Sequence, residues 1–300
     1  MSNSSHSSLL TTYTLAFLAM LFWGMSFVWI KIVFKYYDPI TTIFIRLLVS
    51  SALLVLFAWL MKIPIIPEQK DFKAFLFLAF LEPFTYYIGE SYGVDIVSPS
   101  VAAIMIATIP IITPIFAYFK LKERLSLMNF IGIIVSFMGI LLMILKKDLS
   151  LEYSLEGILL LLLAVFSGAY YTIQLKPLSN SYSPITIIIN MNIIGAIYFL
   201  PFFLYYEYSS FIKVVPNAEL ITALAELIIF SSIMALVFFV KVVERIGPSK
   251  TAAFTNFIPV VTVIAAWFLL PDEVITIKML IGIFVVTVGV FVAQIKFRKS

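Results

Sequence analysis

The chain has 300 residues, of which 62% are hydrophobic and only 12% are charged. A soluble domain has about 25% charged residues, so we expect an all-α membrane protein whose outer surface faces lipid. The chain has no cysteine, one histidine (His6) and no phosphate-binding loop, which excludes disulfides, thiolate or histidine metal sites and ATP-driven chemistry. No cofactor is therefore expected. The net charge of +4 is spread over short loops and does not indicate a nucleic-acid partner.

Apolar runs long enough to cross a bilayer follow one another along the chain. A helix needs about 20 residues for this, and the strict alternation of barrel strands is absent. The runs predict ten transmembrane helices, with residues 1–11 as an N-terminal cytoplasmic tail. In chain order they are Thr12 to Phe34, Pro39 to Met61, Phe72 to Val94, Val97 to Phe119, Met128 to Leu145, Gly157 to Leu175, Pro184 to Tyr206, Leu220 to Val240, Ser249 to Leu270 and Met279 to Ile295.

Lysine and arginine residues are unevenly distributed between the two sides of the predicted bundle. The loops on one side hold thirteen of them, those on the other side hold six, and Arg46 lies inside the second predicted helix. Cytoplasmic loops carry the excess of positive charge. The side with thirteen is therefore expected to face the cytoplasm, and both chain termini lie on that side.

The second half of the sequence repeats the first. The matched residues are Pro99-Ser100, Ile109-Pro110, Thr113 and Ala117 with Pro248-Ser249, Ile258-Pro259, Thr262 and Ala266, all 149 positions apart, then Glu123 and Gly139 with Glu273 and Gly289 after a one-residue shift, and, more weakly, Gly24 with Gly168 and Pro39-Ile40-Thr41 with Pro184-Ile185-Thr186. Each half, residues 12–147 and 155–297, would hold five helices. Because five is odd, the second half would enter the membrane from the opposite face, and such inverted repeats build a site at the midplane.

A family resemblance rests on several of these features together. They are Phe22-Trp23-Gly24 with Lys31, Pro39 with Arg46, the Ser-Pro-Ser and Gly-Pro-Ser openings at 98–100 and 247–249, and the proline-bearing fourth and ninth helices with Glu123 and Glu273 beyond them. In this pattern the chain resembles the drug/metabolite transporter superfamily, ten-helix carriers with two tandem EamA-type domains. The resemblance implies a carrier of the bacterial inner (plasma) membrane, often an exporter of amino acids or other metabolites. The third helix, with Glu82 and Glu90, is more acidic than the family pattern.

Four charged residues stand out inside predicted spans: Arg46, Glu82, Glu90 and Glu226, the last of which could equally well extend to the membrane surface from its helix end. A charge in hydrocarbon costs at least about 2.5–3.5 kcal/mol, so such residues face a partner or a wet cavity. One hypothesis is that Arg46 binds a substrate carboxylate while Glu82 or Glu90 takes up a proton or binds a cationic group. The alternative is an ion pair between Arg46 and Glu90 that only joins two helices.

Uncharged residues supply further candidates for substrate contact. Trp23, Tyr87, Asn190 and Asn256 could line a cavity, and each could equally well pack or hydrogen-bond between helices. Pro110 and Pro259 occupy equivalent repeat positions and each frees a carbonyl one turn upstream, so they are candidate hinges.

We therefore expect a secondary transporter of small metabolites that works by alternating access. Coupling of transport to protons is one hypothesis for its energy source. The glycine pairs Gly132/Gly139 and Gly282/Gly289 indicate close helix packing or a homodimer interface, and the sequence leaves both open. Two other functions are kept as alternatives, a membrane-embedded lipid-modifying enzyme and a passive channel. The short loops, poor in His, Asp and Cys, favour a carrier over an enzyme, and scattered single charges in inverted repeats favour a carrier over a ring-lined channel.

Overall fold

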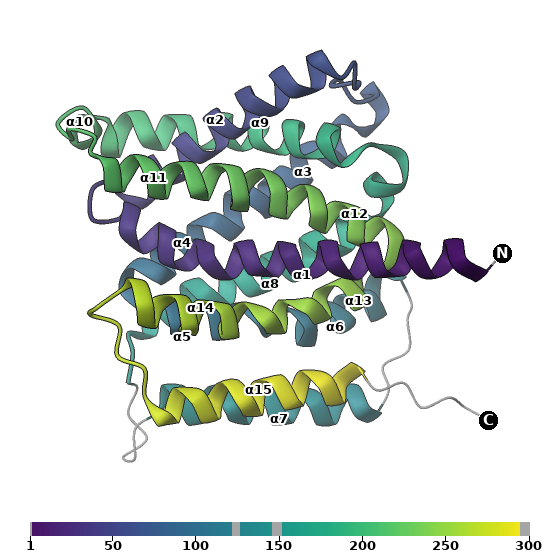
Figure 1. Ribbon diagram of the computed structural model, residues 1–300, viewed down its shortest axis with the longest axis vertical. Coiled ribbons are helices and arrows are strands. Elements are labelled where there is room, and N and C mark those ends of the chain that lie inside the picture. Colours follow the sequence, from purple (N-terminus) through teal and green to yellow (C-terminus); the bar gives the residue numbers. More distant parts are fainter. Residues whose placement is uncertain (1, 122–126, 146–151, 295–300) are drawn as a thin grey trace.

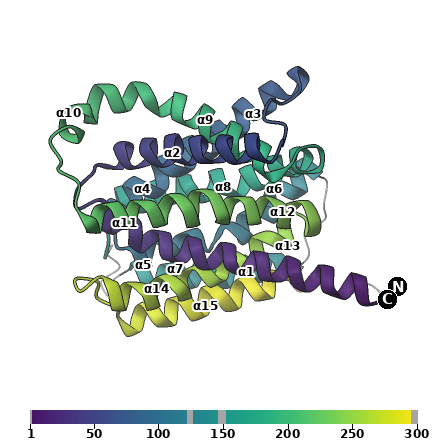
Figure 2. The same cartoon turned by 45° about the horizontal axis from the view of Figure 1, so that its top comes forward.

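The computed structural model describes residues 2–121, 127–145 and 152–294. In this part of the chain the secondary structure is helical throughout, without a β-strand. The helices lie roughly side by side in one bundle, and α1 extends beyond the others at its N-terminal end (Figures 1 and 2).

The helices of the first half are α1 (Ser2–Val33), α2 (Pro39–Leu60), η1 (Gln69–Asp71), α3 (Phe72–Ala79), η2 (Phe80–Thr85), α4 (Tyr86–Ile96), α5 (Pro99–Ile106), α6 (Ile109–Leu121) and α7 (Leu127–Ile144). Those of the second half are α8 (Leu155–Ser181), α9 (Pro184–Phe202), η3 (Phe203–Glu207), α10 (Tyr208–Phe211), α11 (Ala218–Glu226), η4 (Leu227–Ala235), α12 (Leu236–Ile246), α13 (Pro248–Ala252), η5 (Ala253–Asn256), α14 (Phe257–Leu269) and α15 (Ile277–Gln294). η1 and η5 are 3₁₀ helices, and η2, η3 and η4 are π-helical.

Seven helical stretches of the described chain are long and apolar enough to cross a membrane: Leu9–Val33, Pro39–Leu60, Pro99–Lys120, Leu155–Ser181, Pro184–Phe211, Ala218–Ile246 and Pro248–Leu269. The other three predicted spans correspond to α7 and α15, whose apolar stretches are shorter, and to the interrupted segment from α3 to α4. α1 is helical from Ser2, so the helix begins within residues 1–11, the segment predicted as a tail, and its span-like stretch begins at Leu9.

The third predicted span is broken at Glu82. Its backbone is extended (φ −142°, ψ 122°) and is followed by Pro83, which has no N–H to continue the helical hydrogen bonds. The carbonyl of Leu81 accepts a hydrogen bond from Ser167 Oγ at 2.7 Å, so a neighbouring helix satisfies part of the exposed backbone. The break turns the Glu82 side chain into the buried interior, where it is 7% exposed.

Glycines bring the helices of the two halves close together. A Cβ on Gly24 would lie 3.1 Å from the Ile258 carbonyl oxygen, and one on Gly168 would lie 3.2 Å from Ile109 Cδ1. Similarly, Gly139 abuts Val286 on α15, and Gly289 abuts Ser136 on α7. These α7 and α15 glycines thus serve packing within one chain, and Figure 1 shows the two helices as a pair along one edge of the bundle.

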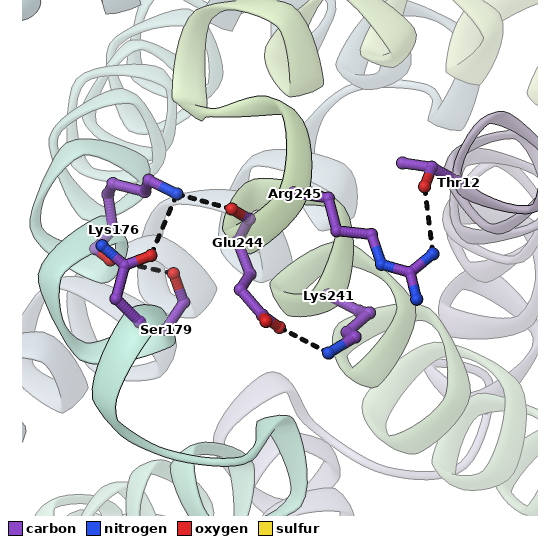
Figure 3. Close-up of polar contacts among 7 residues, drawn as sticks. Thr12, Lys176, Ser179, Lys241, Glu244 and Arg245 are labelled. Atoms are coloured by element: carbon purple, nitrogen blue, oxygen red, sulfur yellow. Dashed lines mark hydrogen bonds and ion pairs between the residues drawn. The ribbon is translucent and has the colours of Figure 1, made fainter. Parts of the chain in front are cut away.

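Lysines close the ends of two equivalent helices. Lys31 Nζ donates to the carbonyl of Asp95 near the end of α4 (3.0 Å), and Lys176 Nζ donates to the carbonyl of Glu244 near the end of α12 (2.6 Å) (Figure 3). The last carbonyls of a helix have no partner within the helix, so each lysine stabilises such an end through its charge and its donors.

Candidate functional site

A cavity lies in the interior of the bundle. It is bounded by α1, α2, the broken segment from η2 to α4, α5, α6 and α8, together with η4, α12, α13, η5 and α14. Its lining residues are Trp23, Ser26, Phe27, Arg46, Glu82, Tyr86, Tyr87, Glu90, Ile106, Ile109, Gly168, Tyr171, Thr172, Ser231, Phe239, Ala252, Thr255 and Ile258. Both halves of the sequence therefore contribute to one chamber.

Arg46 is the most deeply buried charged residue of the chamber, with 1% of its surface exposed. Its Nε donates to Ser232 Oγ at 3.1 Å, and its Nη2 lies 3.5 Å from Ser231 Oγ. The guanidinium carbon lies 4.6 Å from the centroid of the Tyr87 ring, a cation–π arrangement. The third nitrogen, Nη1, has no hydrogen-bond partner. A buried guanidinium held on two sides, with one nitrogen unpaired, favours binding of an anionic ligand group.

Two carboxyl groups share the chamber with Arg46. Glu90 is 5% exposed and accepts a hydrogen bond from Tyr86 Oη at 3.1 Å. Within the described chain no hydrogen bond joins Glu82 to another protein group, and no carboxylate lies within ion-pair distance of Arg46. The ion pair between Arg46 and Glu90, one of the two sequence-based alternatives, is thus not formed.

Aromatic rings enclose these charges. The Trp23 ring lies 4.9 Å from that of Phe239, centroid to centroid, and Tyr86 lies 5.9 Å from Tyr87. Such rings provide apolar surface for the body of a ligand, and their faces attract cations. The chamber therefore combines an apolar wall with one cationic and two acidic groups, which suits a small amphiphilic or zwitterionic solute.

Five of the seven predicted substrate-contact residues line this one chamber: Trp23, Arg46, Glu82, Tyr87 and Glu90. The two asparagines lie elsewhere.

Asn190 Nδ2 donates to the carbonyls of Ile65 (2.7 Å) and Thr186 (2.8 Å), so its amide ties α9 to the loop after α2. Asn256 lines a separate groove with Tyr13, Lys250, Phe254 and Phe291, and its Oδ1 is buried without a partner. Both asparagines lie on helix faces turned away from the chamber. The packing of neighbouring helices sets which way each face points, and the residue type alone does not reveal it.

The two prolines predicted as hinges follow breaks in their helices. Pro110 comes after the turn at residues 107–108 that separates α5 from α6, and Pro259 comes after η5. Next to them, Ile109 and Ile258 face the chamber.

Sequence reasoning missed several hydroxyl groups of the site. Ser231 and Ser232 hold Arg46, while Ser26, Thr172 and Thr255 line the chamber. The adjacent serines in the middle of the apolar run from Leu227 to Ala235 were a usable signal, since hydroxyls at that depth need a partner.

The long apolar helices and the enclosed polar chamber are those of an integral membrane protein. The family model described as the EamA-like transporter family matches this chain twice, over residues 10–145 and over residues 155–294. The chain therefore belongs to the EamA-like transporter family, and it is a membrane transporter.

Individual proteins agree with the family assignment. The chain is 27% identical over 275 residues to an uncharacterized transporter of Archaeoglobus fulgidus, covering 92% of this chain and 95% of that protein. It is 27% identical over 260 residues to the uncharacterized transporter YetK of Bacillus subtilis, covering 85% and 78%. A solved crystal structure shares the fold with a TM-score of 0.69 at 13% identity, covering 95% of this chain and 96% of that one.

Proposed function

We propose that this protein is a secondary transporter that exports small metabolites, such as amino acids, by alternating access. The observation that carries the proposal is the buried chamber, in which Arg46 keeps one unpaired nitrogen and which is also lined by two carboxyl groups and aromatic rings. Such a site is costly to maintain in a membrane protein unless a ligand completes it. Arg46 would bind the carboxylate of the solute, and Glu82 or Glu90 would bind its ammonium group or a proton.

The architecture that we propose is ten spans arranged as two inverted five-helix repeats, residues 12–147 and 155–297. Support comes from contacts that recur with the halves exchanged. Gly24 on α1 meets Ile258, and its counterpart Gly168 on α8 meets Ile109, which is equivalent to Ile258. The contact of Gly139 with Val286 is likewise mirrored by that of Gly289 with Ser136. A two-fold relation between the halves produces such exchanged pairs.

The chamber itself supports the same relation. From Glu82 onward, where the repeat separation is 149 positions, four lining residues of the first half have a lining counterpart in the second half: Glu82 and Ser231, Glu90 and Phe239, Ile106 and Thr255, Ile109 and Ile258. A chamber built from equivalent positions is suited to rocking of one half against the other, with the helix breaks before Pro110 and Pro259 as hinges.

Charge balance bears on proton coupling. The chamber holds one permanent cation and two carboxyl groups, so an empty and dehydrated site is neutral when one proton is shared by the carboxyls. A cationic solute would replace that proton, whereas a zwitterion would leave it in place. We therefore expect a cationic substrate to move against one proton and a zwitterion to move without this exchange.

The decisive experiment is a metabolite screen in proteoliposomes with and without an imposed pH gradient. Saturable uptake of a chemically unchanged solute supports a carrier; a modified solute would indicate an enzyme, and flux that does not saturate would indicate a channel. Glu82→Gln and Glu90→Gln should reduce uptake or alter its pH dependence. Glu226→Gln is the matched control, because Glu226 lies outside the chamber. Full activity and unchanged pH dependence in both chamber variants would refute proton coupling.

We place the protein in the bacterial inner membrane on the basis of the family resemblance, and both termini in the cytoplasm on the basis of the thirteen to six distribution of Lys and Arg. The cysteine-free sequence allows a clean test. A single cysteine is added at either end of the chain and labelled with a membrane-impermeant thiol reagent. Both ends should react from the same, cytoplasmic side, and labelling from different sides would reject an even number of spans.

A further inference from the structure

A tyrosine–carboxylate contact joins the two halves at the end of the bundle where α11 begins. Tyr36 Oη donates to Glu219 Oε2 at 2.5 Å, and Lys35 Nζ contacts Glu219 Oε1 at 2.8 Å. Tyr36 and Lys35 lie between α1 and α2 in the first half, whereas Glu219 opens α11 in the second half. We call this contact the α11 latch.

A corresponding contact lies where α3 begins. Tyr182 Oη donates to Asp71 Oδ2 at 2.6 Å and accepts from the backbone N–H of Glu68 at 3.1 Å. Tyr182 lies between α8 and α9 in the second half, and Asp71 directly precedes α3 in the first half. We call this contact the α3 latch. It joins the same two elements as the α11 latch, with the halves exchanged.

The latches occupy opposite ends of the bundle. α2 runs from the end where α11 begins to the end where α3 begins (Figure 1). Tyr36 lies three residues before the Pro-Ile-Thr motif that starts α2, and Tyr182 lies two residues before the motif that starts α9. Asp71 directly precedes α3, and Glu219 is the second residue of α11. The two contacts thus join corresponding loops and helix starts of the two halves, although the tyrosines differ by one position in register.

Other contacts between the halves join α2 and the loop after it to α9 and η3 at three places. Near the α11 latch, Glu207 accepts hydrogen bonds from the N–H groups of Ile40 (3.2 Å) and Thr41 (2.6 Å). At the other end Thr186 Oγ1 donates to the Pro64 carbonyl at 2.7 Å. Midway, Asn192 Nδ2 donates to Ser50 Oγ at 2.9 Å. A pair held at both ends and in the middle acts as an axis and not as a gate.

The α11 latch differs from this axis in exposure, whereas the hydrogen bond of the α3 latch is partly buried. The side chains of Lys35 and Glu219 are 52% and 48% exposed, so water competes for their contact and breaking it is cheap. By contrast, Glu207, Asn192 and Thr186 are buried. A contact that opens in every transport cycle must be weak, whereas one that serves as the pivot must persist.

We propose that the α11 and α3 latches are the two gates of the transport cycle, and that each opens when the chamber opens to its own end. This inference rests on the proposed alternating-access function. Removing one latch should shift the population of conformations toward the state that is open at that end. Because the latches lie at opposite ends, their removal should have opposite effects on access to the chamber.

The test uses Ser26→Cys as a reporter in the cysteine-free chain, because Ser26 lines the chamber and is 3% exposed. A membrane-impermeant cationic thiol reagent is applied to right-side-out and to inside-out vesicles. Tyr36→Phe should raise the labelling rate about three- to tenfold from one side, as expected for loss of one exposed, charge-assisted hydrogen bond. Tyr182→Phe should raise it by a similar factor from the other side. Tyr205→Phe, at a site that is 82% exposed, is the control.

Second variants guard against effects on folding. Glu219→Ala should reproduce the sidedness of Tyr36→Phe, and Asp71→Asn that of Tyr182→Phe. An increase from the same side for both tyrosine variants, or no increase beyond that of the Tyr205→Phe control, would overturn the latch proposal even if the solute screen is positive. Opposite-sided increases would uphold it even if no solute is found, so the two proposals can fail separately.

Discussion

Gly195 on α9 offers a sharp test of how the broken third span positions Glu82. A Cβ built at Gly195 would lie 2.3 Å from Pro83 Cγ and 3.1 Å from Leu47 Cδ1. Ordinary contact begins at 3.4 Å, so in Gly195→Ala the two segments must separate by about 1 Å. Pro83 is bonded directly to Glu82, and the carboxyl group must move with it.

The size of the effect follows from two opposing terms. Overpacking a well-packed interior costs about 1–3 kcal/mol, whereas replacing glycine by alanine inside a helix gains about 1 kcal/mol. Pro83 is part of a rigid ring and cannot swing aside as a flexible side chain would. We therefore expect Gly195→Ala to lower the free energy of unfolding by about 1–2 kcal/mol. Because we propose that Glu82 contacts the solute, its displacement by about 1 Å should weaken transport by up to about 100-fold.

Two assays check this expectation. Thermal unfolding in detergent reports stability, and uptake in proteoliposomes reports the affinity for the solute found in the screen. Gly282→Ala is the matched control, because its nearest neighbour would lie 3.3 Å away, near ordinary contact distance, and Gly282 is outside the chamber. If Gly195→Ala matched Gly282→Ala in both assays, the packing of Pro83 on α9 would not position Glu82, and the reasoning would be wrong.

Further expectations follow from the same structure. Ser232→Ala should raise the KM for an anionic or zwitterionic solute about tenfold, because Arg46 Nε loses its hydrogen-bond partner at 3.1 Å. A hydrogen bond to a charged group contributes about 1.5–3 kcal/mol. An unchanged KM in uptake assays would contradict this expectation. Gly289→Ala should lower the unfolding temperature in detergent, because its Cβ would lie 2.5 Å from the backbone nitrogen of Ser136 and force α15 from α7. A stable Gly289→Ala protein would show that this helix pair is loosely packed. Tyr87→Leu should weaken solute binding by removing the ring 4.6 Å from the Arg46 guanidinium, and Tyr87→Phe, which keeps a ring, should restore most of it in the same uptake assay.

The sequence predicted the positions of the helices well because apolar length is a direct physical requirement of a bilayer. All the predicted spans fall on helical segments, although seven of the described stretches meet the length and apolarity of a span by themselves. The interruption at Glu82 could have been inferred from Pro83. The π-helical geometry of η4 has no such proline, and it depends on packing that the sequence does not reveal.

The charged part of the site was predictable for an energetic reason. Arg46, Glu82 and Glu90 stand in apolar runs, and a charge in hydrocarbon must face a polar space. Asn190 and Asn256 carry no such penalty, so a partner on an adjacent helix or loop satisfies them as well as a chamber does. The rotation of the helix determines whether the asparagine faces a partner or the chamber. For Asn190 the partner is the carbonyl of Ile65.

The two halves contribute corresponding positions to the chamber, but the residue types at those positions differ. At repeat-equivalent positions of the chamber, Glu82 stands opposite Ser231 and Glu90 opposite Phe239. Both acids thus come from the first half, while the second half contributes Ser231 and Ser232, which hold Arg46. In the alternating-access cycle that we propose, equivalent positions in the two halves would let the chamber open at either end, which needs two conformations of similar energy. Both carboxyls lie in one half and would give the site a polarity of its own, so that a solute with distinct ends would bind in one orientation whichever end is open.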